Sequence, residues 1–234
     1  MQVPTQLPLS VRLRADAQFD NFIAGPNAVL LDSLVQLSDA QSDETILYLY
    51  GASGCGRSHL LQACCHRVEL RGLTAIYLPA SELLDLDPAV FESLEIYDLI
   101  CIDDIDQLMG QPLWEEALFH LYNRIRDLSK RLVISANAAP KSVGAELPDL
   151  GSRLLWGLVF QLHELDDSSK LDALSASAQA RGLTVSDEVL QFMLNHGSRN
   201  LKVLMEQLDQ LDQASLTAKR KLTIPFIKQV LGWS

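Results

Sequence analysis

The sequence predicts an α/β domain built on a parallel sheet, followed by a small all-helical domain. Three observations support this prediction. Short apolar runs alternate with helix-like stretches up to about residue 162, a glycine-rich loop joins the first apolar run to a helix, and only helix patterns occur beyond residue 166. We expect an extended tail at residues 1–18, the α/β domain at 19–164 and the helical domain at 165–234.

The predicted strands are short and apolar. Leu99–Ile102 is apolar on both faces, which is typical of a strand covered by helices on each side. A first helix is expected to begin near Asn27, before the sheet starts. We expect strands at residues 45–50, 75–79, 98–105 and 131–137, and helices at 57–70 and 113–129.

The C-terminal part has no strand pattern, and three or four helices fit it. Ser186 followed by two acidic residues is a good helix start, and Pro225 suits a first helical turn. Gly182 and Gly197 separate the segments. The expected helices lie at residues 168–182, 186–196, 200–216 and 224–232.

Composition limits the function classes. The 234 residues are 48% hydrophobic and carry a net charge of −11, so direct non-specific binding to nucleic acid is disfavoured. We expect DNA to be contacted only through a protein partner. The four cysteines lack zinc-site spacing, and we expect them to be reduced thiols. Without a signal peptide or membrane-spanning run, the expected location is the cytoplasm, with no membrane partner.

A glycine-rich loop, Gly51–Ser58, follows the first predicted strand and reads G-x-x-x-x-G-R-S. Phosphate-binding P-loops read G-x-x-x-x-G-K-[ST], so Arg57 stands where a lysine is usual. The glycines let backbone N–H groups surround phosphate oxygens, Arg57 offers a permanent cation, and Ser58 can reach Mg²⁺. The alternative is a plain strand–turn–helix connection. The candidate nucleotide-binding residues are Gly51, Ser53, Gly54, Cys55, Gly56, Arg57, Ser58 and His59.

Polar residues follow the later strands of the predicted sheet. Asp103 is a candidate to hold hydrated Mg²⁺ together with Ser58, and Asp104 is a candidate to polarise the attacking water. Asn137 can sense a γ-phosphate, and Arg153 can serve as an arginine finger in a neighbouring nucleotide site. Taken singly, Asp103 and Asp104 have an acidic strand-to-loop cap as their alternative, Asn137 suits a turn equally well, and Arg153 fits a surface arginine better.

These elements, in this order and followed by a helical lid, resemble the AAA+ ATPases, and more closely the bacterial replication initiator DnaA. Residues 146–162 are similar to the finger region of that family, and residues 180–211 and 222–231 to its lid. The resemblance covers about residues 19–233. It implies that Lys202 corresponds to the lid arginine that points at the phosphates, and Arg199 is positioned to share that role.

The tail differs from DnaA. The resemblance leads us to expect neither the helix-turn-helix DNA-binding domain nor the N-terminal interaction domain of DnaA. Instead, residues 6–11, QLPLSV, resemble peptides that dock on the bacterial sliding clamp. An extended segment with apolar anchors suits a groove, and the alternative is a terminus with chance leucines. The candidate clamp-binding residues are Gln6, Leu7, Leu9 and Val11.

A truncated DnaA-like body with such a tail resembles the clamp-bound, DnaA-related regulators that inactivate DnaA. The resemblance implies a negative regulator of replication initiation. Bound to the polymerase sliding clamp (the beta subunit), it would stimulate hydrolysis of DnaA-bound ATP, using Arg153, and leave inactive ADP-DnaA. Its own site would hold ADP, or ATP, with Mg²⁺, and hydrolyse weakly or not at all.

Two other interpretations remain open. One is an autonomous AAA+ ATPase that acts as a clamp or helicase loader, and the other is a plain tether between DnaA and the clamp. Oligomeric state is open as well, since a monomer, a head-to-tail assembly and a nucleotide-dependent dimer are all compatible with the sequence.

Overall fold

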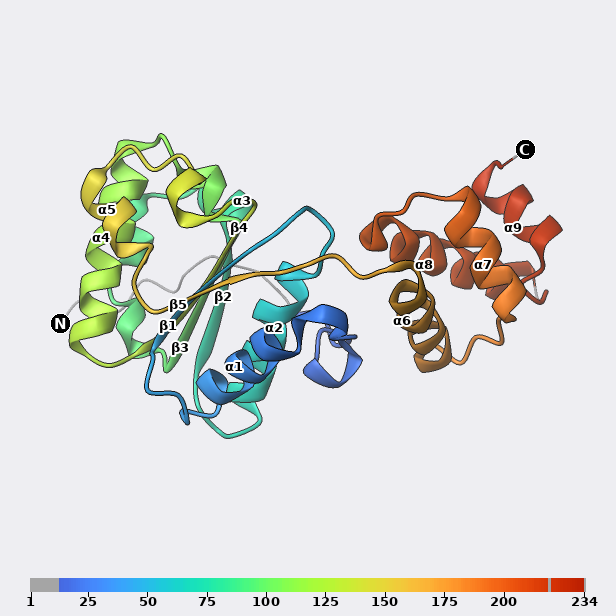
Figure 1. The fold of residues 1–234 in the computed structure, drawn as a ribbon, viewed down its shortest axis with the longest axis horizontal. Coiled ribbons are helices and arrows are strands. Elements are labelled where there is room, and N and C mark those ends of the chain that lie inside the picture. Colours follow the sequence, from blue (N-terminus) through green and yellow to red (C-terminus); the bar gives the residue numbers. More distant parts are fainter. Residues whose placement is uncertain (1–12, 219, 234) are drawn as a thin grey trace.

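The computed structural model describes residues 13–218 and 220–233, so the candidate clamp-binding residues Gln6 to Val11 lie outside the described residues. An α/β domain and a helical lid are joined by a single extended segment, residues 162–166 (Figure 1). This arrangement confirms the predicted fold class. The observed boundary lies between the last strand, which ends at Gln161, and the first lid helix, which begins at Asp167.

The sheet contains five parallel strands in the order β2-β3-β4-β1-β5. Because all the strands run in the same direction, their carboxyl ends lie along one edge of the sheet. The central strands β3 and β4 are buried along their whole length, as expected for a sheet covered on both faces. The strands are β1 (Ile46–Tyr50), β2 (Ala75–Pro79), β3 (Leu99–Asp103), β4 (Arg131–Ala136) and β5 (Leu158–Gln161).

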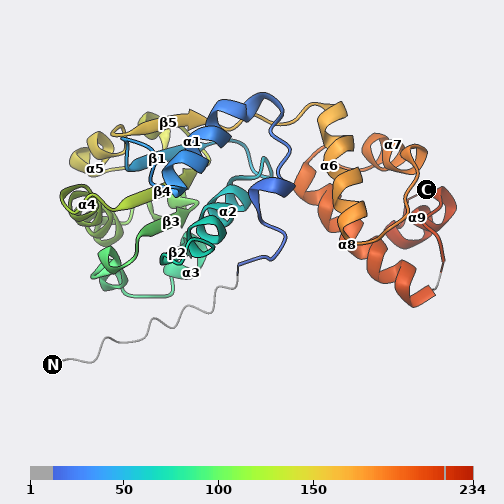
Figure 2. The same ribbon diagram turned by 90° about the horizontal axis from the view of Figure 1, so that it is seen from below.

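Helices cover both faces of the sheet (Figure 2). On one face, α1 and α2 pack with the strands around Leu34, Leu61 and Val133. On the other face, a larger core includes Tyr48 and Tyr122. The helices are α1 (Ala28–Ser38), α2 (Arg57–Glu69), α3 (Ala80–Leu83), α4 (Pro112–Asp127) and α5 (Pro148–Arg153), with 3₁₀ turns at Phe19–Asn21, Gly25–Asn27, Pro88–Phe91, Leu94–Ile96, Ile105–Leu108 and Pro140–Ser142.

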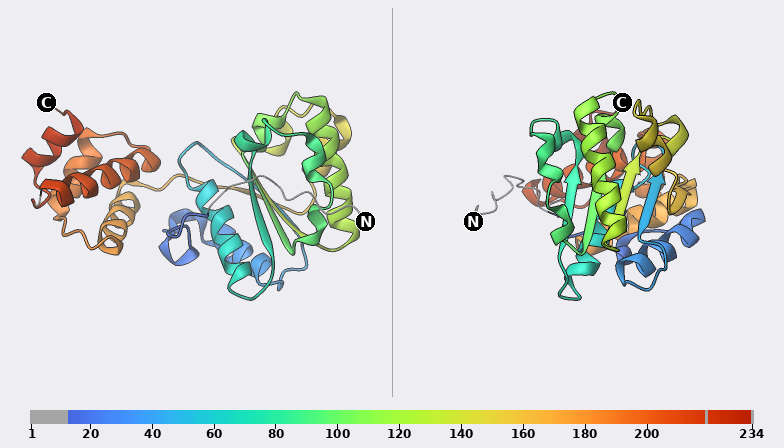
Figure 3. Two further views of the ribbon diagram at one scale, coloured as in Figure 1. Left: turned by 180° about the vertical axis from the view of Figure 1, so that it is seen from behind. Right: turned by 90° about the vertical axis from the view of Figure 1, so that its left-hand side faces the viewer.

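The lid is a bundle of helices that lies beyond one side of the α/β domain (Figure 3). Its apolar residues form two adjoining clusters, one around Leu174 and Leu204 and one around Met193 and Ile227. Pro225 lies in the first turn of the last helix, as predicted. The lid helices are α6 (Asp167–Ala180), α7 (Asp187–His196), α8 (Leu201–Ala218) and α9 (Ile224–Leu231).

Two features differ from what the sequence suggests. Strand β5 was not predicted, because this four-residue edge strand alternates between half-buried and exposed residues. Residues 13–18, which we expected in the extended tail, contact the α/β domain, and Ala17 is buried there. Every helix among the described residues falls short of the length and apolarity that a membrane-spanning helix needs.

Candidate functional site

The glycine-rich loop connects β1 to the N-terminus of α2. Gly54 and Gly56 have φ angles of +84° and +107°, a region that side-chain-bearing residues rarely adopt. Gly56 immediately precedes Arg57, the first residue of α2, so the free N–H groups of this helix end face the loop. The loop therefore has the backbone geometry that a phosphate cradle requires.

The strand ends bring three predicted residues to the same edge of the sheet as the loop. Asp103 ends β3, Asp104 follows it, and Asn137 follows β4, the strand that pairs with both β3 and β1. The Asp103 carboxylate accepts hydrogen bonds from the hydroxyls of Ser135 and Tyr77, the latter at 2.6 Å. Burial and the neighbouring Asp103 charge raise the pKa of Tyr77, so its hydroxyl stays a donor.

Asn137 is held at its backbone rather than through its side chain. Its N–H donates to a carboxylate oxygen of Asp106 at 2.9 Å, and the residue is exposed. The side-chain amide is therefore available at the sheet edge. This geometry suits the predicted role in sensing phosphate and does not require it.

Arg57 is buried, with 8% of its surface exposed, and it bridges the two halves of the site. Its guanidinium donates to the carbonyl of Gly51 and, at 2.6 Å, to the carboxylate of Asp104. Burial lowers the pKa of Arg57, but the hydrogen bond and charge of Asp104 outweigh it and hold the pKa above its ordinary value. The residue that replaces the usual lysine is thus paired with the carboxylate predicted to polarise water.

A cavity of about 150 Å³ lies where the loop, the connecting segment and the lid meet. Of the predicted residues, it brings together Ser53, Gly54, Cys55 and Arg199. Cys55 is buried, and burial raises the pKa of its thiol, so it stays protonated. The remaining lining residues, Glu164, Leu165, Lys170, Asn200 and Leu201, were not predicted.

Asn200 links the lid directly to the loop. Its side-chain amide donates to the carbonyl of Ser53 at 2.9 Å, and its oxygen accepts from the N–H of Lys202, in the first turn of α8. A side chain at Gly54 would collide with Asn200, so glycine is required there for the two parts to meet. An asparagine at the start of a helix is typical of an N-cap. This local pattern does not predict the additional hydrogen bond from Asn200 to Ser53.

These residues fit a nucleotide. The Nε atom of Arg57 is buried without a hydrogen-bond partner, and Lys170 is a buried cation on the wall of the cavity. Backbone N–H groups and cations are the donors that phosphates need, and Ser58 and Asp103 supply oxygens for Mg²⁺, which keeps most of its waters. No cluster of three or more metal-ligating side chains occurs within residues 13–218 and 220–233.

Six predicted nucleotide residues do not line the cavity: Gly51, Gly56, Arg57 and Ser58 of the loop and helix start, and His59 and Lys202. Lys202 is exposed on α8. Arg199, by contrast, lines the cavity and pairs with Asp167 at 3.3 Å. The ring of His59 faces the carbonyl of Gln18 at 2.9 Å and packs against Phe22. Burial lowers the pKa of His59, and its role here is to hold the N-terminal segment.

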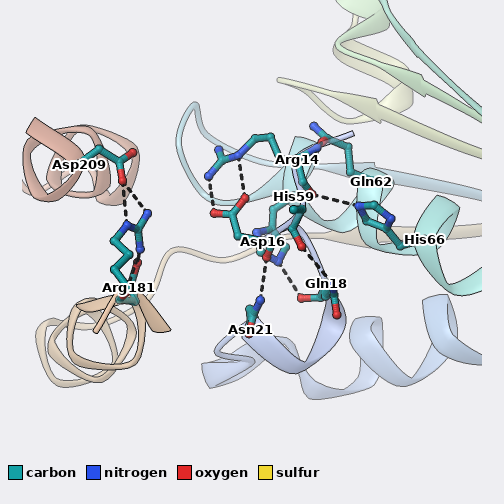
Figure 4. A network of polar contacts seen from close by, with 11 residues as sticks. Arg14, Asp16, Gln18, Asn21, His59, Gln62, His66, Arg181 and Asp209 are labelled. Atoms are coloured by element: carbon teal, nitrogen blue, oxygen red, sulfur yellow. Dashed lines mark hydrogen bonds and ion pairs between the residues drawn. The ribbon is translucent and has the colours of Figure 1, made fainter. Parts of the chain in front are cut away.

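The segment that leads out of the tail is attached to α2 (Figure 4). The N–H of Arg14 donates to Gln62 at 2.8 Å, and the ring of His66 lies 3.0 Å from the Arg14 carbonyl. Phe22 lies against Gly56, where an added Cβ would come within 2.8 Å of its ring. The root of the tail therefore touches the loop that forms the cradle.

Arg153 ends α5 and does not line the cavity. Its Nε donates to Asn123 at 3.0 Å, and its guanidinium lies 3.8 Å from the ring centroid of Trp156. The guanidinium of Arg126 lies 4.2 Å from the centroid of the same ring. Within the described part of the chain, no carboxylate pairs with Arg153 at 4.0 Å or less. A half-buried, oriented and unpaired cation is what an arginine finger needs.

Comparisons with known proteins identify the same two domains. A family model described as the bacterial DnaA ATPase domain matches residues 13–161, and one described as the lid domain of Hda matches residues 153–231. An uncharacterized protein of Haemophilus influenzae is 41% identical over 228 residues, which cover 97% of this chain and 98% of that protein.

Solved structures share the fold. Domain III of the replication initiation protein DnaA from Thermotoga maritima has a TM-score of 0.85 and 24% identity, covering 95% of this chain and 98% of that one. AMPPCP-bound DnaA from Aquifex aeolicus has a TM-score of 0.70 and 24% identity, covering 84% of this chain and 65% of that one. At this level of identity the likeness concerns the fold alone.

The parallel sheet, the P-loop at its edge and the helical lid define an AAA+ domain. The chain belongs to the bacterial DnaA ATPase-domain family, whose model matches more than half of it. Its lid is of the Hda type, which makes it an Hda-like, DnaA-related AAA+ protein and connects it with DNA replication.

Proposed function

We propose that this protein is a negative regulator of replication initiation that stimulates hydrolysis of ATP bound to DnaA while it is attached to the sliding clamp. The observation that carries the proposal is Arg153. Its guanidinium is oriented by Asn123 and Trp156, lies outside the protein's own cavity and has no carboxylate partner among the described residues. Such a cation is available to another protein's nucleotide.

The chemistry asked of Arg153 is electrostatic. Negative charge spreads over the oxygens of the transferred phosphoryl group in the transition state, and an arginine supplied by a neighbour stabilises it. In P-loop enzymes such a finger contributes roughly 10³- to 10⁵-fold in rate. Arg153 would therefore act on DnaA-bound ATP without any covalent step on this chain.

The protein's own site, in this proposal, holds ADP or ATP with Mg²⁺ and hydrolyses it slowly or not at all. The Arg57–Asp104 pair supports this, because the carboxylate that would polarise water already binds a buried cation. The phosphates of a bound nucleotide would bring negative charge that the cradle and the lid bind. The loop N–H groups, Arg57 and Arg199 would bind them, and Asn200 would keep the lid against the loop.

The test replaces the finger. Arg153→Ala should abolish stimulated hydrolysis in an assay with clamp, DNA and ATP-loaded DnaA, while leaving the protein folded and clamp binding intact. Arg126→Ala is the matched control, because Arg126 contacts the same Trp156 ring. Full stimulation by Arg153→Ala would disprove the role of Arg153 and leave a plain tether as the explanation.

A clamp or helicase loader is the second candidate, and the position of Asp103, Asp104 and Asn137 at the cradle favours it. A loader should turn over ATP without DnaA. Steady-state ATPase measurements on the isolated protein separate the two functions, since the regulator should show little or no turnover.

A further inference from the structure

Lys170 is a buried cation that nothing in the sequence pattern assigned to the nucleotide. It lies in the first turn of α6 with only 6% of its surface exposed, on the same helix face as Ala173 and Leu174. It lines the cavity between lid and loop. Among the described residues, no carboxylate oxygen lies within 4.0 Å of its ammonium nitrogen, and no acceptor hydrogen-bonds to it.

The stem of Lys170 is buried, but its ammonium nitrogen is not among the polar atoms that are fully buried without a partner. Since Lys170 lines the cavity and no acceptor among the described residues binds its ammonium group, that group is accessible from the cavity. The charge is therefore expected to meet an anion that enters the cavity.

The rest of the cavity indicates which anion. Arg199 adds a second lid cation, and Ser53–Cys55 of the cradle line the same cavity. Glu164 adds one carboxylate, which can accept hydrogen bonds from sugar hydroxyls but would repel a free phosphate. Cations together with one acceptor suit a nucleotide better than inorganic phosphate.

We propose that Lys170 is a nucleotide ligand supplied by the lid, whose ammonium group binds a phosphate oxygen of the nucleoside diphosphate held in the cradle. This inference rests on the nucleotide site of the proposed function. The contact would join lid and α/β domain through the ligand, beside the Asn200–Ser53 hydrogen bond that joins them directly.

The variant Lys170→Met tests the inference, because it keeps the length of the side chain and removes the charge. We expect calorimetry to show ADP affinity reduced about 10- to 100-fold, as for one charge-assisted hydrogen bond, with adenosine affinity unchanged. The nucleotide-free variant should fold and melt at a temperature close to that of the wild type. Lys170→Gln should weaken ADP binding likewise, and Lys170→Arg should retain it.

Lys221→Met is the matched control, since Lys221 of the lid is exposed, lies outside the cavity and has no proposed contact with the nucleotide, and this variant should bind ADP as the wild type does. The inference is wrong if Lys170→Met binds ADP normally, or if the affinity loss follows Lys202→Met, at the other candidate lid cation, instead. A wild type that binds no ADP would overturn both this inference and the nucleotide part of the proposed function. A negative result in the Arg153 test would not contradict the inference about Lys170.

Discussion

Single side chains explain why the cradle departs from an ordinary P-loop. Arg57 has a planar fork that can bind two acceptors, and here it donates to Gly51 and to Asp104. A lysine could not span both in this fixed geometry. The substitution therefore ties the cradle to the strand end and engages the candidate water-polarising carboxylate, which favours holding a nucleotide over hydrolysing it.

Trp156 should position the finger. The guanidinium groups of Arg126 and Arg153 both contact its ring, and each cation–π contact contributes about 0.5–2 kcal/mol. We expect Trp156→Ala to lower stimulated DnaA hydrolysis about tenfold, and Trp156→Phe, which keeps an aromatic face, to restore most of it. Clamp binding and ADP affinity should stay at wild-type values. Normal stimulation by Trp156→Ala would show that the ring does not orient Arg153.

Local patterns predicted the residues of the cradle and strand ends, because a P-loop and a strand end are contiguous in sequence. They did not predict Lys170, Glu164 or Asn200, since these meet the loop only through the path of the connecting segment and the packing of the lid. One signal was present for Lys170: a lysine on the same helix face as Ala173 and Leu174 is unusual in an amphipathic helix.

Among the elements, α5 matters most, because it carries Arg153. Glu115 of α4 fixes where this helix starts. Its buried carboxylate accepts hydrogen bonds from the N–H groups of Glu146 and Leu147, immediately before Pro148, and from Gly110 at 2.7 Å. The charge compensates backbone donors that would otherwise be buried without partners.

Removing that charge should displace α5. Glu115→Gln puts an amide donor among N–H groups, and we expect the free energy of unfolding to fall by about 2 kcal/mol. For a chain of this size, that corresponds to a melting temperature about 4–8 °C lower. Stimulated hydrolysis should weaken with it. The neighbouring Glu116→Gln is the control, because that side chain is exposed. Equal melting temperatures for the two variants would contradict this role of Glu115.

The strong elements of the fold were predictable and its edges were not. Strands β1 to β4 each contain an unbroken apolar run, and α4 is a long amphipathic helix, so the sequence pattern alone identifies them. Strand β5 is short, exposed on alternate residues and ordered by pairing with β1. Pairing between segments more than a hundred residues apart leaves no local signal.

At the scale of the whole molecule, three parts converge on the cradle. The lid reaches it through Asn200, the root of the tail through Phe22, and strand β3 through Asp104. A nucleotide bound in the cradle would lie next to the lid, the root of the tail and the end of strand β3. This arrangement gives the proposed structural nucleotide a physical role, since it can set the angle between lid and α/β domain while the reaction takes place on the partner.

The tail should provide attachment only. Changing both Leu7 and Leu9 to Ala removes two proposed apolar anchors, and we expect clamp binding to be lost in a pull-down assay. The melting temperature and ADP affinity should not change. The Arg14→Ala variant, altered at the root of the tail, should still bind the clamp. Retained clamp binding by the double variant would remove this segment from the proposal.

The most direct measurement follows labelled ATP bound to DnaA through a single turnover, with clamp loaded on DNA and the present protein preloaded with unlabelled ADP. If the reaction occurs on the partner, the wild type and Asp104→Asn should both convert the label to ADP rapidly, and Arg153→Ala should not. Loss of conversion with Asp104→Asn, or undiminished conversion with Arg153→Ala, would contradict the proposal.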